Sequence, residues 1–385
     1  MKVPLSLALG LLFTGSAGAQ DEGALRISVS NALDTARSGE IIELKGALLG
    51  RFKGDDLQKL RVVDPKTSAE LLGQAVDSDG DLVFDQLVFQ ADFGPRETRT
   101  FAIRLGERRA PTLEDFRVYG RFVRERFDDF AWENDKVAFR LYGEALETWQ
   151  KEPLTSSAVD VWEKKTRRLA QGEWYMVDDY HKDHGEGGDF YPAGASRGCG
   201  GTGLWKDGQL YVSKNFRASR VFANGPLRLI FEVDYPVWEV PGVKEAKRVT
   251  LDAGQNLARF ESRYTLDAAG GPVAWAVGIR KAEGASVRIE RERGFARSWE
   301  HLTRYGENGW LGCAVVMDPA QIVDLAEDKT NHLVVARTPP GMPAAHYAGS
   351  GWDRSGDFKD VAAWDAYVED FARRLRSPLK IEVAR

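Results

Sequence analysis

Short apolar runs, separated by glycine and other turn-forming residues, recur along this chain and restrict it to folds built mainly from strands. The chain has 385 residues, 39 of which are glycine, a residue that permits the tight turns between strands. In the first third, apolar runs occupy residues 27–29, 41–44, 82–84, 87–89 and 101–103. Strands at this spacing predict a small β-sandwich domain over residues 20–110.

The strand candidates become longer and more numerous after residue 110, which predicts a second domain over residues 111–385. Residues 117–122 alternate between polar and less polar side chains, as expected of a strand with one buried face. Further candidates span residues 136–142, 158–162, 209–221, 227–237, 247–251, 258–266, 273–279, 286–289, 311–316 and 333–336. So many strands predict a large double-sheet architecture whose concave face holds a ligand.

One helix is predicted, near the C-terminus. Behind a turn at residues 355–357, apolar residues recur every three or four positions: Val361, Trp364, Val368, Phe371 and Leu375. This period is typical of an amphipathic helix with one buried face. The predicted fold class is therefore mostly β, with a small N-terminal β-sandwich, a large β domain and a C-terminal helix.

The charge of the chain restricts its partners. The sequence contains 53 Lys and Arg against 58 Asp and Glu, a net charge of −5. No overall basic field is therefore available to attract nucleic acid or an anionic membrane, and neither is predicted as a partner. Only two cysteines are present, which excludes a disulfide scaffold and a four-cysteine zinc site. Cys199 and Cys313 either pair or remain free thiols.

The first 19 residues have the pattern of a secretory signal peptide. Lys2 provides a positive charge, residues 3–13 are an apolar run, and Ala17-Gly18-Ala19 supplies small residues for cleavage before Gln20. The apolar run is shorter than the roughly 20 residues needed to span a bilayer. We therefore expect an exported protein that is periplasmic or secreted.

Residues 121–135 form the first dense group of polar side chains. The group contains Arg121 and ends in Glu133-Asn134-Asp135. One interpretation is a solvated hairpin in which opposite charges pair. The other is an anion site, because an arginine guanidinium donates two parallel hydrogen bonds to a carboxylate.

Residues 178–205 form a second and richer group. It holds two of the five histidines, His181 and His184, and ends in a glycine-rich stretch. Its low apolar content argues against a purely structural role in a core, and its glycines allow the backbone to approach a ligand closely. A loop that carries functional side chains is therefore predicted here, and these include Tyr180, Glu186, Tyr191 and Arg197.

Three chemistries are open for this second group. His181, His184, Asp183 and Glu186 do not have the spacing of a helical zinc motif, and we predict neither a metal nor another cofactor. Paired carboxylates among Glu133, Asp135 and Glu186 would suit glycoside hydrolysis. Proton abstraction next to a carboxylate needs an arginine, a base and an acid, and these residues supply all three.

Two other segments have a recognisable chemical character. Residues 77–81 place carboxylates at alternate positions, but the pattern departs from a calcium loop and favours a solvated turn. Residues 342–354 are predicted to form a strand end carrying His346, followed by a loop with Trp352. An aromatic ring there would suit a sugar subsite or would pack on the terminal helix.

Several strings along the mature chain carry a family resemblance: residues 118–122, 129–135, 180–181, 185–187, 196–201, 347–349 and 351–352. These strings resemble domain-of-unknown-function family 4861, bacterial proteins often found with polysaccharide-degradation systems. The resemblance implies a large antiparallel β-supersandwich, similar to that of galactose-mutarotase-type sugar enzymes, behind a small N-terminal β domain. For one branch of the family it implies dehydration of non-reducing-end uronic acids in ulvan oligosaccharides.

The sequence therefore predicts an exported carbohydrate-active lyase or dehydratase. It would eliminate water or a glycosidic oxygen from C4 of a uronic acid in an anionic oligosaccharide and leave an unsaturated uronate. His181 or His184 would be the base, and Tyr180 or Tyr191 the acid. The predicted substrate-binding residues are Arg121, Arg197, Glu133, Asn134, Asp135, Glu186, His346 and Trp352. The alternatives are a glycoside hydrolase and a non-catalytic glycan-binding protein.

Overall fold

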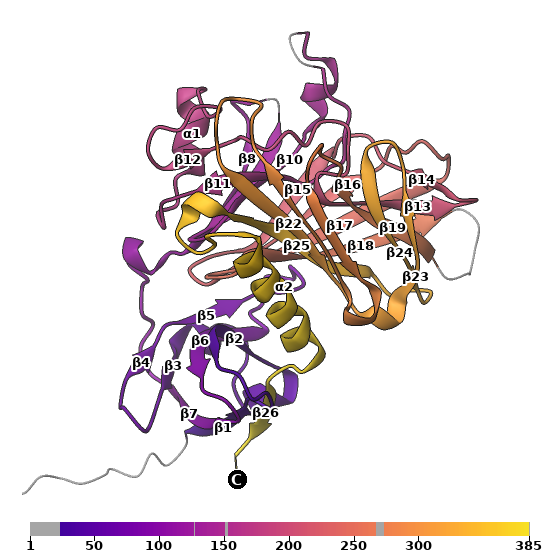
Figure 1. Ribbon diagram of the computed structural model, residues 1–385. Coiled ribbons are helices and arrows are strands. Elements are labelled where there is room, and N and C mark those ends of the chain that lie inside the picture. Colours follow the sequence, from indigo (N-terminus) through magenta and orange to yellow (C-terminus); the bar gives the residue numbers. More distant parts are fainter. Residues whose placement is uncertain (1–23, 127, 151–152, 267–272, 385) are drawn as a thin grey trace, which may run out of the picture.

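The computed structural model describes residues 24–126, 128–150, 153–266 and 273–384. The predicted signal peptide lies outside these residues. The fold is mostly β, as predicted, and consists of antiparallel sheets with a long helix near the C-terminus (Figure 1). None of the helices within the described residues is long and apolar enough to cross a bilayer.

The N-terminal strands form two small sheets with one core between them. One sheet has the order β26 (Lys380–Val383), β1 (Leu25–Ser30), β7 (Thr98–Leu105), β3 (Leu60–Val63) and β4 (Glu70–Leu71). The other has the order β2 (Arg37–Lys45), β6 (Gln86–Phe93) and β5 (Gly73–Val76). Phe89 and Phe101 pack edge to face at 5.1 Å between the sheets. Because β26 pairs with β1, the last strand of the chain completes this N-terminal sheet.

The large region is organised around an eight-stranded antiparallel sheet. Its order is β15 (Ala218–Asn224), β16 (Arg228–Tyr235), β17 (Val243–Asp252), β18 (Leu257–Leu266), β25 (Ala344–Trp352), β22 (Trp310–Val316), β21 (Phe295–His301) and β20 (Ser286–Glu290). Both faces of this sheet are covered. The alternation in β22 reflects this: Cys313 and Val315 belong to one core cluster, whereas Ala314 and Val316 belong to another.

Two five-stranded sheets cover the first face. One has the order β12 (Gly187–Gly188), β11 (Asp160–Lys164), β10 (Ala138–Leu141), β9 (Asp129–Asn134) and β8 (Val118–Val123). The other has the order β14 (Gln209–Tyr211), β13 (Cys199–Lys206), β19 (Val273–Arg280), β24 (Asn331–Thr338) and β23 (Ile322–Glu327). The rings of Phe130 in β9 and Phe231 in β16 stack at 4.0 Å, which places β9 against the large sheet. The main core of the molecule lies between these layers.

The predicted C-terminal helix, α2 (Val361–Arg376), covers the second face of the large sheet (Figure 1). Asp360 caps its N-terminus by accepting a hydrogen bond from the Ala363 backbone at 2.9 Å. Trp364 is fully buried against β22 and β25. Gly312 and Gly351 are opposite each other in these two strands, and a Cβ atom at either position would overlap the Trp364 ring. The glycines therefore allow the indole to lie directly on the sheet.

Several sequence predictions differ from the structure. The apolar run 82–84 is not a strand: Leu82 is 88% exposed with a φ of 72°. The glycine-rich stretch predicted as a loop forms β13, in which a Cβ at Gly201 would lie 2.5 Å from the Arg197 carbonyl oxygen. The predicted loop with Trp352 is instead the end of β25. The predicted division at residue 110 stays a prediction.

Candidate active site

The charged stretch around Asp129 is a buried strand whose two faces differ in chemistry. Phe130 and Trp132 of β9 point into the main core. Because successive side chains alternate, Asp129, Ala131 and Glu133 occupy the opposite face. There Ala131 packs in a small cluster with Trp162 of β11 and with side chains of α1 (Gln171–Val177) and the segment that follows it. The outer face of this sheet and α1 lie side by side in Figure 1, and the candidate site consists of side chains from this face and from the segment after α1.

Three aspartates surround the guanidinium of Arg140 at the centre of this face. Arg140 Nε donates to Asp160 Oδ2 at 2.9 Å, and Nη2 donates to Asp160 Oδ2 at 2.5 Å and to Asp189 Oδ2 at 2.8 Å. Asp129 Oδ2 lies 4.0 Å from Arg140 Nη1. Arg140 and Asp160 are cross-strand partners in the β10–β11 register, so strand pairing itself brings the two charges together. All four side chains are buried.

Arg126 and Tyr180 lie next to this ionic centre. Arg126 Nε donates to Tyr180 Oη at 2.5 Å, and the Arg126 guanidinium carbon lies 4.7 Å from the ring centroid of Trp149. The Tyr180 ring stacks on Trp162 at 4.9 Å and lies 5.8 Å from the Arg140 guanidinium carbon. Tyr180 is therefore held between two arginines, with its hydroxyl directed at one of them.

His181 lies at the solvent side of the cluster. Its side chain is 36% exposed, its ring stacks on half-buried Tyr305 at 4.0 Å, and its centroid is 4.8 Å from that of Tyr180. The distance from His181 Nδ1 to the Asp189 carbonyl oxygen is 2.8 Å. Because a carbonyl only accepts hydrogen bonds, the proton of the neutral ring is on Nδ1 and the Nε2 lone pair can accept a proton.

Burial raises the pKa values of the acidic groups in this cluster. It raises the pKa of Asp129 to about 7, although the charges of Arg140 and Arg126 oppose the shift. It also raises the pKa values of Asp160 and Asp189, against the opposing effect of Arg140. The pKa of Tyr180 is raised by burial as well, with both arginines opposing. A carboxyl group whose pKa lies near neutrality, as at Asp129, is characteristic of acid–base sites.

This pKa of Asp129 makes a testable contribution to stability. An unfolded aspartate has a pKa of about 4, so the unfolded state loses its proton first and stability falls from about pH 4 to pH 7. Asp129→Asn removes this dependence. Relative to the wild type, we expect the variant to gain on the order of 2 kcal/mol between pH 5 and pH 8. Urea unfolding at both pH values measures this difference, and parallel pH profiles for the two proteins would contradict it.

Three residues predicted for the site lie on the sheet surface or in exposed loops. Arg121 forms an ion pair with Glu125, and its guanidinium carbon is 5.9 Å from the Tyr175 ring centroid. His184 Nε2 lies 3.0 Å from Asp179 Oδ2 in an exposed loop. Glu186 pairs with Arg168 at 2.6 Å, and both side chains are partly exposed. Arg121 is therefore close to the candidate site, whereas His184 and Glu186 form their contacts on the surface of the loop.

Glu133, Asn134 and Asp135 make connections that hold the fold together. Glu133 forms a buried ion pair with Lys164 and accepts from the Gln171 backbone at 2.7 Å. Asn134 Nδ2 donates to the carbonyls of residues 252 and 255, both at 2.7 Å. Asp135 pairs with Arg117 at 2.6 Å. These contacts orient β9 and the N-terminus of α1, the two elements that carry or adjoin the candidate site.

The remaining predicted residues are buried between the sheets. Burial lowers the pKa of His346 to about 3, and its Nε2 donates to the Gly200 carbonyl at 2.9 Å. Trp352 Nε1 donates to the Asn308 carbonyl at 2.7 Å. Tyr191 is buried, and burial raises its pKa. Arg197 lies in a separate polar cluster. The structure thus brings Tyr180 and His181 together and places these four elsewhere.

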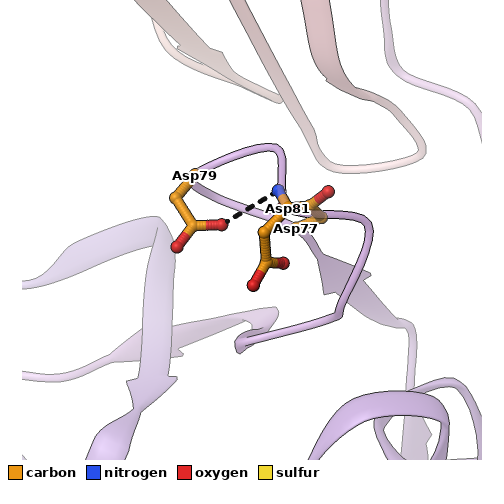
Figure 2. A group of neighbouring side chains, drawn as sticks. All are labelled: Asp77, Asp79 and Asp81. Atoms are coloured by element: carbon orange, nitrogen blue, oxygen red, sulfur yellow. Dashed lines mark hydrogen bonds between the residues drawn. The ribbon is translucent and has the colours of Figure 1, made fainter.

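The cysteines and the acidic turn also have defined places. Cys199 and Cys313 are both free and buried. Figure 2 shows the turn with Asp77, Asp79 and Asp81, whose ligand oxygens lie within 4.8 Å of one another. Asp77 accepts from the backbone nitrogens of residues 80 and 82 at 2.7 and 2.9 Å. Asp79 accepts from the Asp81 nitrogen at 3.2 Å. These carboxylates therefore stabilise the turn by accepting hydrogen bonds from its own backbone.

The sequence patterns did not identify Arg140, Asp160 and Asp189 as a unit. They come from β10, from β11 and from the segment after β12, and each looks ordinary in its own stretch of sequence. The one sequence signal available was charge inside an apolar strand: Arg140 and Asp160 both interrupt apolar runs. A buried charge needs a partner, so such positions can be searched for pairs.

The fold and this site define a mostly β protein with a buried arginine–aspartate centre, a buried tyrosine next to it and a partly exposed histidine on the solvent side. The family described as Domain of unknown function (DUF4861) matches residues 29–381, and the chain belongs to this family. A relative from Formosa agariphila, "Uncharacterized protein P7", is 31% identical over 396 residues, which cover 98% of each chain.

Three solved structures are distantly similar. The first is an alpha-mannosidase from Enterococcus faecalis, with a TM-score of 0.46 and 10% identity over 94% of this chain and 46% of that chain. The second is a protein in glycosyl hydrolase family 38 from the same organism, with a TM-score of 0.49 and 11% identity over 95% of this chain and 48% of that chain. The third is a mutant of the heparan sulfate lyase HepC from Pedobacter heparinus, with a TM-score of 0.36 and 10% identity over 64% of this chain and 37% of that chain. The chain spans less than half the length of each of them.

Proposed function

We propose that this protein is an exported carbohydrate-active lyase or dehydratase. It eliminates water or a glycosidic oxygen from C4 of a uronic acid in an anionic oligosaccharide. The observation that carries the proposal is the grouping of Arg126, Tyr180 and His181 beside three buried aspartates. Export rests on the signal-peptide pattern of residues 1–19, and the ulvan oligosaccharides of one family branch are one substrate class to test.

Arg126 neutralises the substrate carboxylate. The proton at C5 of a uronate is acidic only when the charge of the neighbouring carboxylate is balanced, because the carbanion spreads its charge onto that group. Arg126 has the right chemistry and lies beside Tyr180. We prefer it to Arg121 and Arg197 because its Nε donates to the hydroxyl of Tyr180, the proposed acid, whereas Arg197 contacts Ser157 and Thr202 in a separate polar cluster.

His181 acts as the base and Tyr180 as the acid. His181 Nε2 takes the proton from C5, the C4=C5 double bond forms, and the C4–O bond breaks. Tyr180 gives its hydroxyl proton to the departing oxygen, which leaves as water or as a sugar hydroxyl. The Asp189 carbonyl keeps His181 in the tautomer that this step needs. Proton transfer by positioned groups of this kind typically accelerates reactions about 10²–10⁴-fold.

The aromatic side chains at the rim provide the sugar contact. Trp149 and Tyr305 are both half-buried, one beside Arg126 and the other beside His181. The apolar face of a pyranose packs on such rings. A substrate residue that touches both rings would have its carboxylate near Arg126 and its ring hydrogens near His181.

A second candidate function is glycoside hydrolysis. The observation in its favour is the pKa of about 7 at Asp129, because a hydrolase needs a protonated carboxyl group as general acid near neutral pH. A hydrolase would give new reducing ends, and its products would contain no double bond conjugated to a carboxylate.

The test is incubation with uronate oligosaccharides. Alginate, pectin, ulvan and glycosaminoglycan fragments are the substrates, and ultraviolet absorbance of the conjugated product is the readout. We expect absorbance to rise with at least one substrate. New reducing ends without absorbance would favour the hydrolase, and binding without any product would favour a non-catalytic glycan-binding protein. Either result would reject elimination.

A further inference from the structure

A cleft lies between the N-terminal sheets and the second face of the large sheet. In Figure 1 the N-terminal sheets are below the large sheet, and α2 runs beside them. The cleft has a volume of about 950 Å³, which is within the usual range for ligand sites, about 300–1,000 Å³. Strand β2 lines one side, and strands β16, β17 and β18 line the other. The candidate active site is on the opposite side of the large sheet, so the cleft is a separate feature of the molecule.

Ion pairs fix the walls of this cleft. Among the described residues, eight arginines and lysines and five aspartates and glutamates line it. Their ion pairs include Arg228 with Glu43 and Asp252, Arg374 with Glu40, and Arg259 with Glu261. The pair between Arg228 and Glu43 joins β16 to β2, and the pair between Arg374 and Glu40 joins α2 to β2. The elements around the cleft are therefore tied to one another, and the cleft is already formed without a ligand.

Three arginines that line the cleft form no ion pair with a carboxylate of the described residues. Arg248 donates to the Ser78 carbonyl, and Arg376 donates to the Arg293 carbonyl. The side chain of Arg263 is exposed in the cleft and has no hydrogen-bond partner within the described part of the chain. Because each guanidinium carries five N–H donors, most of the donors of these three side chains are available to a ligand.

Arg248 and Arg263 are neighbours on the floor of the cleft. The register of β17 and β18 pairs Arg248 with Glu261, and Arg263 follows two residues later on the same face. Glu232, Glu261 and Asp85 attract Arg248 without forming an ion pair with it, whereas Arg263 repels it. The cleft is therefore not strongly basic. An acidic group placed between the two guanidinium groups would relieve their repulsion and accept hydrogen bonds from both.

The rest of the lining favours an acidic sugar over a bare anion. The half-buried ring of Tyr347 contacts Phe371 edge to face at 5.2 Å, and the apolar face of a pyranose packs on aromatic rings. Asp318 and Thr250 also line the cleft, and their side-chain oxygens can accept hydrogen bonds from sugar hydroxyls. An inorganic anion would use only the arginines, whereas an acidic oligosaccharide would use all of these groups.

We propose that this cleft is a second binding site, which takes an anionic oligosaccharide. Arg248 and Arg263 hold a carboxylate or sulfate group of the ligand, Asp318 accepts from its hydroxyls, and Tyr347 contacts a sugar ring. The inference concerns binding alone and does not depend on the reaction proposed for the candidate active site. A second site of this kind would increase the time that the protein spends on a polymer with many acidic residues.

Calorimetric titration of the full-length protein at constant ionic strength tests this proposal. The probes are a galacturonic acid trisaccharide and a heparin tetrasaccharide, with maltotriose as the neutral sugar and sodium sulfate as the free anion. We expect at least one acidic oligosaccharide to bind, and maltotriose and sulfate to bind at least tenfold more weakly. Arg263→Gln removes one charged donor group and should weaken the binding of the acidic oligosaccharide about tenfold.

Arg104→Gln is the matched control. Arg104 is also an exposed strand arginine without an ion pair among the described residues, but it lies in β7 and outside the cleft. This variant loses the same charge as Arg263→Gln and should bind the acidic oligosaccharide like the wild type. Both substitutions replace exposed side chains, so we expect both variants to fold, and circular dichroism checks this.

Three results would overturn the proposal. One is that neither acidic oligosaccharide binds. Another is equal binding to the wild type and to Arg263→Gln, because the ligand would then occupy a different place. The third is sulfate binding as tightly as the oligosaccharides, which would identify a site for a free anion only. Failure to form an unsaturated product would reject the proposed elimination and would leave these binding results unchanged.

Discussion

Replacing Arg140 by methionine should lower the free energy of unfolding by about 3–5 kcal/mol, because it leaves buried carboxylates without their counter-charge. Arg140 donates three hydrogen bonds to Asp160 and Asp189 and lies 4.0 Å from Asp129. All three aspartates are buried. Methionine keeps the apolar part of the side chain but lacks the guanidinium, which lies 5.1 Å from the Trp162 ring centroid, so the loss reports the removal of the charge together with this contact. Urea unfolding at pH 7 measures this quantity.

Two variants control this experiment. Arg168→Met removes a half-exposed arginine that pairs with Glu173 and Glu186, and a pair of this kind contributes only about 0–1 kcal/mol. Replacing Asp160 and Asp189 by asparagine in the Arg140→Met background should recover part of the loss, because the unbalanced charges are then gone. If Arg140→Met lowers the free energy of unfolding no more than Arg168→Met does, the proposed role of Arg140 as the counter-charge of the buried aspartates is wrong.

Replacing Tyr180 by phenylalanine should reduce kcat/KM by about 10²–10⁴-fold, the usual contribution of a positioned acid. The ring stacks on Trp162 and packs beside Tyr175, and phenylalanine keeps both contacts. The hydroxyl that accepts from Arg126 is lost. We therefore expect a large loss of kcat/KM and only a small loss in the free energy of unfolding. Steady-state kinetics with the active oligosaccharide measures kcat/KM.

The other tyrosines make this result specific. Tyr211→Phe changes a partly exposed tyrosine at the edge of the β13 sheet and should leave kcat/KM unchanged. Tyr191→Phe tests the alternative acid, because Tyr191 is buried between the sheets. Full activity in Tyr180→Phe together with a large loss in Tyr191→Phe would contradict the assignment of the acid.

The fold was predictable where one physical pattern decided the structure. Alternation and turn residues identified most of the strands, and the three-to-four-residue period identified α2. The prediction was wrong where tertiary contacts override local signals. Residues 199–206 look like a loop because they are rich in glycine, yet they form a strand in which Gly200 approaches Ala348 and Gly203 approaches Tyr211.

The site was only half predictable for a related reason. Tyr180 and His181 stand out because polar residues gather in one stretch of sequence. Arg140 becomes significant only when the strand register places it opposite Asp160 and the segment after β12 brings Asp189 to its other side. Register depends on which strands pair, and no single stretch of sequence contains that information.

The most direct test of the proposed elimination is the mass of the product from one purified uronate oligosaccharide of known length. Dehydration predicts a product that is lighter than the substrate by one water molecule, absorbs in the ultraviolet and fails to form with Tyr180→Phe. Elimination of a sugar predicts two fragments whose masses sum to that of the substrate, one of them unsaturated. Fragments whose masses sum to substrate plus water, without ultraviolet absorbance, would contradict the account and identify a hydrolase.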